Sequence, residues 1–313
     1  MIPTQWMEQA ADRIAPYLLK TPVTYDPGLD IHFKWESKQV TGSFKARGAL
    51  NKVLSLQEWE RKPGLVAASA GNHGQGVALA ADITGCNAVI YLPETASKIK
   101  VDAIVKAGAQ VEFVAGGYEQ AEKAAQVCSQ ETGRAWISPY NDLQVICGQA
   151  VIGLELMKQL DLREIRLVIV PIGGGGLIAG IGAAIKEKHP DIRLIGVQAE
   201  TSPYFHSLFT RHTQDGVIES PGLADGLEGR VEDDSLTIPL VNRLVDDILV
   251  VSEEDIKRAM RYAWMHYGEI IEGSAAVGLA ARLNGKMEAA TAVIIISGGN
   301  IVKELHQSIV LNS

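Results

Sequence analysis

Short apolar segments rich in β-branched residues alternate with longer helical segments along most of the chain. The first clear apolar run is Leu65–Ala68, and stretches with helical periodicity separate it from the runs that follow. This pattern predicts strands over residues 65–68, 88–92, 111–114 and 136–137, and helices over residues 76–84, 97–107 and 117–130. Strands that alternate with helices of this length form βαβ units and a parallel sheet.

The same alternation begins again near residue 142. A long amphipathic helix is predicted over 142–160, and the continuous apolar run Leu167–Val170 is typical of a strand buried on both faces. Further strands are expected over 192–197, 249–251 and 291–296, with helices over 177–185 and after the capping-box-like residues 252–255. Residues 201–247 lack periodicity, so we expect an irregular segment with some helix there. The chain is therefore predicted to be α/β, with blocks over 46–145 and 146–313 and residues 1–45 packed on one of them.

Composition narrows the classes of function. The 313 residues are 47% hydrophobic, which is ample for a core, and the net charge of −8 gives no basic footprint for nucleic acid or anionic membrane. The three cysteines form no CxxC pair, and the scattered histidines form no metal-binding spacing, so no metal is expected. With no long apolar run and no signal-like start, we expect a cytoplasmic protein with reduced thiols.

The strongest local motif joins a buried strand to four glycines and a helix. Gly173 to Gly176 follow the strand, and Leu177 begins the helix. Glycines allow close backbone approach to an anion, and a helix N-terminus offers free N–H groups, so the motif predicts a phosphate site. The loop also fits the loose dinucleotide pattern G-x-G-x-x-A, with Glu200 near the end of the next strand, and a purely structural crossover is a further alternative.

Other polar loops follow predicted strands, where ligands gather in open α/β sheets. The loop that contains Ser69, Ala70, Gly71, Asn72 and His73 offers backbone N–H groups for a carboxylate and an amide for a cofactor oxygen. Ser297 follows the last buried strand and is a candidate donor to a ring nitrogen, whereas Glu272 precedes a helix. Ordinary capped turns, and an acid favoured by the helix dipole, are the alternatives for these residues.

A single lysine stands among small residues in Ser43-Phe44-Lys45-Ala46-Arg47-Gly48. The amine of Lys45 is a candidate to form a Schiff base with an aldehyde cofactor. The alternative is a solvated lysine at the start of a helix.

Taken in order, these motifs resemble fold type II pyridoxal phosphate enzymes. The nearest match is the threonine/serine dehydratase branch, which also holds serine racemases, and the resemblance spans nearly the whole chain from Lys20-Thr21-Pro22 to Ser297-Gly298-Gly299-Asn300. It implies two open-sheet αβα domains of the tryptophan synthase β-like architecture. Residues 1–45 and 146–313 would form the large cofactor-binding domain, and residues 46–145 the small domain.

The resemblance also implies roles for individual residues. Lys45 would hold pyridoxal 5'-phosphate, with Phe44 against the ring, Asn72 on the ring hydroxyl and Ser297 on the ring nitrogen. The phosphate would lie on Gly173, Gly174, Gly175, Gly176 and Leu177, with Gly226 and Glu272 lining the site. The substrate carboxylate would bind Ser69, Ala70, Gly71, Asn72 and His73, with Asn141 as a neighbour.

The implied reaction is α,β-elimination of L-threonine or L-serine to 2-oxobutanoate or pyruvate and ammonia, as in the short catabolic dehydratases. A lyase for another β-hydroxy amino acid, such as 3-hydroxyaspartate, is a rival. An NAD-dependent dehydrogenase would account for the glycines but not for Lys45 or Ser297. A non-catalytic amino-acid-binding protein on this fold would not need Lys45. The resemblance further implies a homodimer or homotetramer.

Two positions depart from relatives within the resemblance. Serine racemases place a serine that acts as acid and base where this chain has Ala70, which predicts weak or no racemisation. Some relatives hold a cation with acids where this chain has Gln198 and Tyr204, so the metal site is not expected here.

Overall fold

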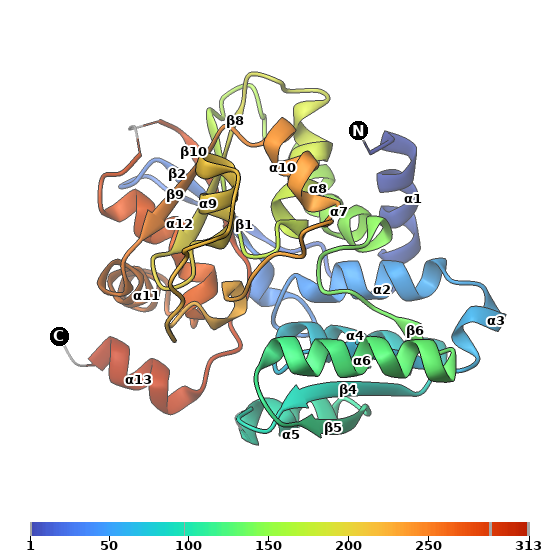
Figure 1. The fold of residues 1–313 in the computed structure, drawn as a ribbon. Helices are drawn as coiled ribbons and strands as arrows, with labels where there is room; N and C mark the ends of the chain where they lie inside the picture. The colour runs from blue at the N-terminus through green and yellow to red at the C-terminus, as the bar shows by residue number, and fades with distance from the viewer. Residues whose placement is uncertain (1, 97, 288–289, 312–313) are drawn as a thin grey trace.

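Two separate sheets organise the chain. The computed structural model describes residues 2–96, 98–287 and 290–311 (Figure 1). One sheet has six strands in the order β1-β2-β10-β7-β8-β9, and the other has four in the order β5-β4-β3-β6. The strands are β1 (Val23–Asp26), β2 (Ile31–Trp35), β3 (Leu65–Ala68), β4 (Ala88–Pro93), β5 (Gln110–Val114), β6 (Ala135–Trp136), β7 (Leu167–Pro171), β8 (Arg193–Ala199), β9 (Asp247–Val251) and β10 (Ala292–Ile296).

Helices connect the strands and cover the sheets. They are α1 (Thr4–Ile14), α2 (Lys45–Ser55), α3 (Glu58–Arg61), α4 (Asn72–Thr84), α5 (Lys98–Lys106), α6 (Tyr118–Thr132), α7 (Leu143–Gln159), α8 (Gly176–Lys186), α9 (Tyr204–Arg211), α10 (Thr237–Leu244), α11 (Glu253–Tyr267), α12 (Gly273–Leu283) and α13 (Lys303–Leu311), with single 3-10 turns η1 (Glu36–Lys38) and η2 (Asp225–Leu227). The predicted strands and helices are confirmed, with ends that differ by a few residues. Segment 201–247 is irregular apart from α9, η2 and α10, as expected. Residue 97, the first of one predicted helix, lies outside the described residues.

An N-terminal hairpin extends the six-stranded sheet. β1 and β2 pair antiparallel, and β2 continues the sheet by pairing parallel to β10, whereas the other neighbours are parallel. Asp26 closes the connecting turn, because its Oδ1 accepts hydrogen bonds from the N–H groups of Gly28 and Leu29 at 2.8 and 3.1 Å. Residues 23–35 therefore belong to the same sheet as the C-terminal strands.

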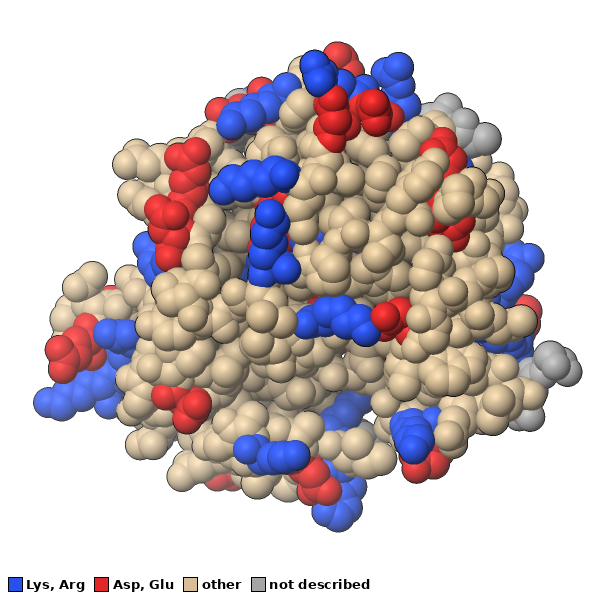
Figure 2. Space-filling model, turned by 180° about the vertical axis from the view of Figure 1, so that it is seen from behind, with Lys and Arg blue, Asp and Glu red and all other residues tan. Residues whose placement is uncertain are grey.

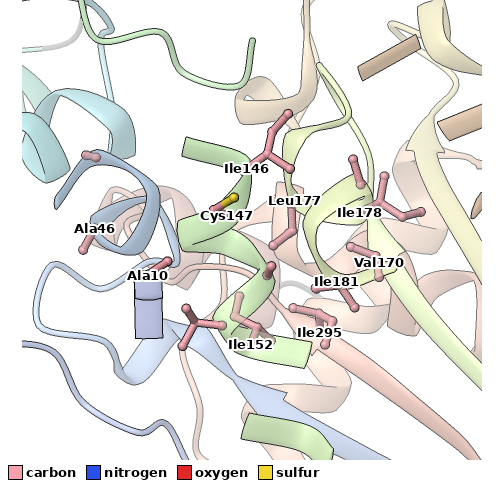
Figure 3. Packing of buried hydrophobic residues seen from close by; sticks show 14 of the residues in the cluster. Ala10, Ala46, Ile146, Cys147, Ile152, Val170, Leu177, Ile178, Ile181 and Ile295 are labelled. Carbon is pink, nitrogen blue, oxygen red and sulfur yellow. The ribbon is translucent and has the colours of Figure 1, made fainter. Parts of the chain in front are cut away.

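The main core lies where helices cover the six-stranded sheet. Ile146 and Ile152 of α7 face Ile178 and Ile181 of α8, above Val170 and Ile295 of the sheet (Figure 3). Close approach of α7 and α8 requires Gly180, since a Cβ there would lie 2.6 Å from the carbonyl oxygen of Ile146. All six of these side chains are fully buried.

Helix α2 lies between the two sheets and contacts α4 on one side and α7 on the other (Figure 1). Glycines make both contacts close. A Cβ on Gly148 of α7 would lie 2.5 Å from the carbonyl oxygen of Arg47, and one on Gly76 of α4 would lie 3.0 Å from that of Lys45. The start of α2 is thereby fixed between the two units.

Charged side chains are mixed on the surface. On the face drawn in Figure 2, Lys and Arg lie interspersed with Asp and Glu around a broad area that carries neither, and no continuous basic patch is seen there. None of the described helices is both long enough and apolar enough to cross a membrane. Cys147 is buried, but Cys86 and Cys128 are half-buried, and all three thiols are free.

Candidate active site

Lys45 is the first residue of α2, and the chain before it is pinned to the loop after β10. The N–H of Phe44 donates to the carbonyl of Ser297 at 3.0 Å, and the N–H of Gly299 donates to the carbonyl of Gly42 at 2.9 Å. Gly42 has a φ of +71°, a conformation that favours glycine. The turn thus holds Lys45 beside the carboxyl end of β10.

A buried ionic cluster anchors α2 two residues further on. Arg47 is fully buried and donates to both carboxylate oxygens of Glu36 at 2.7 and 2.9 Å, and to both of Glu155 at 2.7 and 3.0 Å. Lys34 donates to the same Glu155 and to Gln159 at 2.5 and 2.9 Å. Two cations and two carboxylates balance here, as buried charges require. The Arg47 cluster ties α2 to β2, η1 and α7.

Lys45 is half-buried, and its amine lies near a backbone carbonyl and an aromatic ring. Its Nζ donates to the carbonyl of Pro139 at 3.0 Å and lies 5.3 Å from the centroid of the Phe44 ring. Burial lowers the pKa of Lys45 to about 8, although the nearby carboxylate of Glu272 acts in the opposite direction. A substantial fraction of this amine is therefore neutral, and nucleophilic, near physiological pH.

Asn72 and Glu272 are hydrogen-bonded to each other, and the charge of Glu272 acts on Lys45. Asn72, at the start of α4, donates through Nδ2 to Oε1 of Glu272 at 2.7 Å and accepts a hydrogen bond from Asn300 at 2.7 Å. Glu272 precedes α12 and is buried. Its pKa is raised to about 7, chiefly by burial and then by the charge of Asp225. Asn72 and Glu272 were both candidates from the sequence, but the hydrogen bond between them and the one from Asn300 to Asn72 were not expected.

The loop from β3 to α4 presents free backbone N–H groups. Gly71 is the N-cap of α4 and provides no side-chain cap, while Ser69 Oγ accepts from the Gly71 N–H at 3.1 Å. Uncapped N–H groups at a helix start favour an anion such as a carboxylate. His73 is buried and its Nε2–H donates to the carbonyl of Ile137 at 2.7 Å. Burial, and then the charge of Lys45, lowers its pKa to about 3, so His73 stays neutral and is held in a structural position.

The four glycines form a tight turn between β7 and α8. Gly175 is the N-cap of α8 with a φ of +86° and no side-chain cap. A Cβ on Gly174 would lie 2.4 Å from the ring of Tyr140, and one on Gly175 would lie 2.6 Å from Phe205. Only glycine fits these positions, and the free N–H groups of the first turn of α8 remain available for a phosphate. The cradle therefore fits a phosphorylated cofactor.

The other predicted site residues lie around this centre. The Gly226 N–H donates to Ser274 Oγ at 2.9 Å, and Ser274 follows Glu272 closely in the chain. Ser297 is buried at the end of β10, beside the turn that holds Lys45. Asn141 is engaged at both ends, since its Oδ1 accepts from the Leu236 N–H at 2.9 Å and its Nδ2 donates to Glu232 at 2.5 Å. Hydrogen bonds thus bring predicted residues of both units together near Lys45.

Segment 227–237 lies against the glycine turn, although no sequence pattern indicated this contact. Leu227 lies against Gly173, and Thr237 Oγ1 donates to the Gly174 carbonyl at 2.7 Å. The Glu232 N–H donates to the hydroxyl of Tyr140 at 3.0 Å. The segment has no periodicity that could have announced these contacts.

Gln198, where an acid would be expected for a cation site, forms hydrogen bonds through both ends of its amide. Gln198 Oε1 accepts from the N–H of His206 at 2.7 Å, and its Nε2 donates to the carbonyl of Ser202 at 3.4 Å. Within residues 2–96, 98–287 and 290–311, no group of three or more His, Cys, Asp and Glu side chains is placed to hold a metal ion.

A lysine with a lowered pKa and an uncapped glycine turn at a helix start are groups suited to an enzyme that binds a phosphorylated carbonyl cofactor. Comparison of the sequence with family models agrees. The chain belongs to the family of pyridoxal-phosphate dependent enzymes, whose model matches residues 14–298. Pyridoxal 5'-phosphate is its cofactor, and the dinucleotide interpretation of the glycines is wrong.

Similar proteins narrow the branch. The chain is 44% identical over 275 residues to an L-threonine ammonia-lyase of Thermotoga maritima, covering 88% of this chain and 68% of the relative. It is 38% identical over 312 residues to a catabolic L-threonine dehydratase of Staphylococcus aureus, covering 94% and 88%. Maize serine racemase matches with a TM-score of 0.89 at 34% identity, covering 98% of this chain and 97% of that structure. The predicted α/β architecture of fold type II is confirmed.

Proposed function

We propose that the chain catalyses α,β-elimination of L-threonine and L-serine to a 2-oxo acid and ammonia. The observation that carries the proposal is Lys45, whose amine is held at 3.0 Å from the Pro139 carbonyl with its pKa lowered to about 8. Two relatives that match most of this chain are named for the deamination or dehydration of L-threonine. An amine with this pKa is suited to give up a proton and to take one near neutral pH.

The cofactor would be held by groups from both sheets. The N–H groups at residues 173–177 would bind the phosphate, Asn72 the ring hydroxyl, Phe44 the ring face and Ser297 the ring nitrogen. Bound pyridoxal phosphate supplies an electron-withdrawing ring that stabilises negative charge on the substrate Cα. Ser297 is a hydroxyl rather than a carboxylate and leaves the ring nitrogen largely uncharged, which suits elimination better than transamination.

Lys45 would move the reacting proton. Its Nζ, when free, would be the base that takes the proton from the substrate Cα. The N–H groups of the Ser69–His73 loop would orient the substrate carboxylate at the start of α4, beside Asn72. Glu272, raised in pKa to about 7, holds Asn72 through its Oε1.

Serine racemisation is the alternative that the likeness to maize serine racemase makes worth testing. Ala70 has no group that can carry a proton, so the face of Cα opposite Lys45 lacks an acid there. We expect L-serine to give pyruvate and little D-serine. Chiral chromatography after incubation measures this, and D-serine at a level comparable to pyruvate would contradict the proposal.

A panel of β-hydroxy amino acids tests the proposal. The purified protein, loaded with pyridoxal phosphate, is incubated with L-threonine, L-serine and 3-hydroxyaspartate, and 2-oxo acid and ammonia are quantified. We expect turnover of L-threonine and L-serine, and a loss of about 10³-fold or more in Lys45→Ala. Binding without release of 2-oxo acid from any of them would instead favour an amino-acid-binding protein.

Three further features of the proposal need their own measurements. The chain is proposed to act in the cytoplasm, to assemble as a homodimer or homotetramer, and to divide into a large domain of residues 1–45 and 146–313 and a small domain of residues 46–145. Cell fractionation, light scattering and limited proteolysis test these features in turn.

A further inference from the structure

A carboxylate that the proposed mechanism does not use lies near the glycine turn. Glu232 lies in the segment that lines the glycine turn, and its N–H donates at 3.0 Å to the hydroxyl of Tyr140, whose ring lies against Gly174. Asn141 donates to Glu232 Oε2 at 2.5 Å. Since Asn141 lies two residues after Pro139, whose carbonyl accepts from Lys45, one short stretch of chain connects this carboxylate to the reacting amine.

One oxygen of Glu232 has no partner. Oε2 is bonded to Asn141, but Oε1 is shielded from solvent and accepts no hydrogen bond from any residue that the structure describes. A shielded carboxylate oxygen without a donor is costly, and its charge disfavours another anion placed nearby.

The electrostatic surroundings of Glu232 are also acidic. Glu122 on α6 faces it from the other sheet, and burial followed by the charge of Glu232 raises the pKa of Glu122 to about 7. Tyr118 donates to Glu122 at 3.2 Å, and burial raises the pKa values of both Tyr118 and Tyr140, so neither phenol offers a charge that would offset the carboxylates. Lys100 of α5 is already paired with Asp225, so it does not offset the charge of Glu232.

We propose that Glu232 determines the side-chain specificity of the proposed reaction. Held by Asn141, its carboxylate tolerates amino acids with a neutral side chain and disfavours those whose side chain ends in a carboxylate. This inference rests on the proposed function, and it separates L-threonine and L-serine from 3-hydroxyaspartate. Like charges in a poorly solvated wall repel strongly enough to set such a preference.

The test compares Glu232→Gln, which keeps the shape and removes the charge, with the wild-type protein at pH 8, where Glu122 is also ionised. The ratio of kcat/KM for L-serine to that for 3-hydroxyaspartate is measured in both. We expect the wild type to favour L-serine, and the ratio to fall by about tenfold or more in E232Q. The matched control is Glu131→Gln. Glu131 is exposed near the C-terminal end of α6, the helix that carries Glu122, and its substitution should leave the ratio unchanged.

Binding provides a readout independent of turnover. We expect L-serine to raise the melting temperature of the cofactor-loaded wild type more than L-aspartate does, and E232Q to narrow this difference. An unchanged ratio and an unchanged binding difference in E232Q would overturn the inference. If E232Q does not fold, the same kcat/KM ratio is measured in Glu122→Gln. We expect this ratio to fall by less than in E232Q, and an unchanged ratio would count against the inference. If nothing is turned over, the proposed function fails, and the binding difference alone decides the role of Glu232.

Discussion

Lys45 and Glu272 are neighbouring ionisable groups whose pKa values are shifted toward each other. Burial lowers that of Lys45 to about 8 and raises that of Glu272 to about 7. Both shifts have the same origin, because a poorly solvated site disfavours the charged form of either group. Proton transfer at this site therefore requires little driving force near neutral pH.

The lowered pKa predicts how the cofactor-free protein captures pyridoxal phosphate. Because only the neutral amine attacks, the rate should rise with pH through a midpoint of about 8, whereas an ordinary lysine would give one near ~10.4. Stopped-flow absorbance measures the rate, and Lys45→Ala is the control without capture. Glu272→Gln should lower the midpoint, since it removes a charge that favours the ammonium form. A midpoint near that of a free lysine would contradict this account.

Glu272 predicts a pH dependence of stability. Its folded pKa of about 7 lies above the ordinary value of 4.5, so the folded state holds this proton more tightly than the unfolded state. Its contribution to the free energy of unfolding is complete below pH 4.5 and is lost as the pH rises to about 7. Denaturant unfolding of the cofactor-free protein at pH 5 and pH 7.5 should show a smaller loss in Glu272→Gln than in the wild type. Equal losses would refute the assignment.

The candidate residues of the site could be named from the sequence, but their contacts could not. Lys45 and the glycines stand in motifs with a local chemical meaning, such as a helix start that can bind phosphate. The bond between Asn72 and Glu272 joins positions 200 residues apart, and it depends on how the two sheets meet. Glu232 was missed for a different reason, because it lies in a segment without periodicity or a recognisable motif.

At the scale of elements, α2 is fixed by contacts that sequence periodicity does not reveal. Its first turn carries Lys45 and the buried Arg47, and Gly48 faces Gly148 of α7. Strands β3, β4 and β7 to β10, and helices α4, α8 and α11, were predicted because their sequence pattern is strong. Strand β1 was not predicted, because it has four residues, three of them at least partly exposed, and depends on the Asp26 turn.

Removal of the Arg47 side chain tests how α2 is anchored. Arg47→Met leaves Glu36 and Glu155 with one remaining cation in a buried cluster, and we expect a loss of about 3–5 kcal/mol in the free energy of unfolding. Guanidinium titration measures the loss. The matched control is Lys98→Met, which breaks the ion pair of Lys98 with Asp102. These two side chains are 84% and 59% exposed, so the loss in the free energy of unfolding should be less than about 1 kcal/mol. Similar losses for the two variants would contradict a buried anchor.

The contact between α2 and α7 makes a second prediction at this scale. Gly148→Ala adds a Cβ 2.5 Å from the Arg47 carbonyl oxygen, so backbone must move, and we expect destabilisation of about 1–3 kcal/mol despite the better helix propensity of alanine. Gly117→Ala is the control, since its Cβ would meet only Gln120 Oε1 at 3.6 Å, and it should change stability by less than about 0.5 kcal/mol. Thermal unfolding compares both variants, and a stable G148A would show that the helices are not in close contact.

In the whole molecule, the site belongs to neither sheet alone. The smaller sheet supplies Asn72 and the loop before α4, while the larger supplies the glycine turn, Glu272 and Ser297. Three contacts connect the two units. They are the packing of helix α2, the Lys100–Asp225 ion pair and the Asn72–Glu272 hydrogen bond. Alternation of strands and helices predicted two sheets, but which N-terminal strands joined the larger one could not be read from local patterns.

The central claim is that Lys45 carries the cofactor. Borohydride reduction of the yellow, cofactor-loaded protein fixes pyridoxal phosphate on the lysine that holds it, and peptide mapping by mass spectrometry then identifies that lysine. We predict a single modified peptide that contains Lys45, and no modification at the buried, ion-paired Lys34. Modification of another lysine with Lys45 left free, or a protein that binds the cofactor without any reducible bond, would contradict the account.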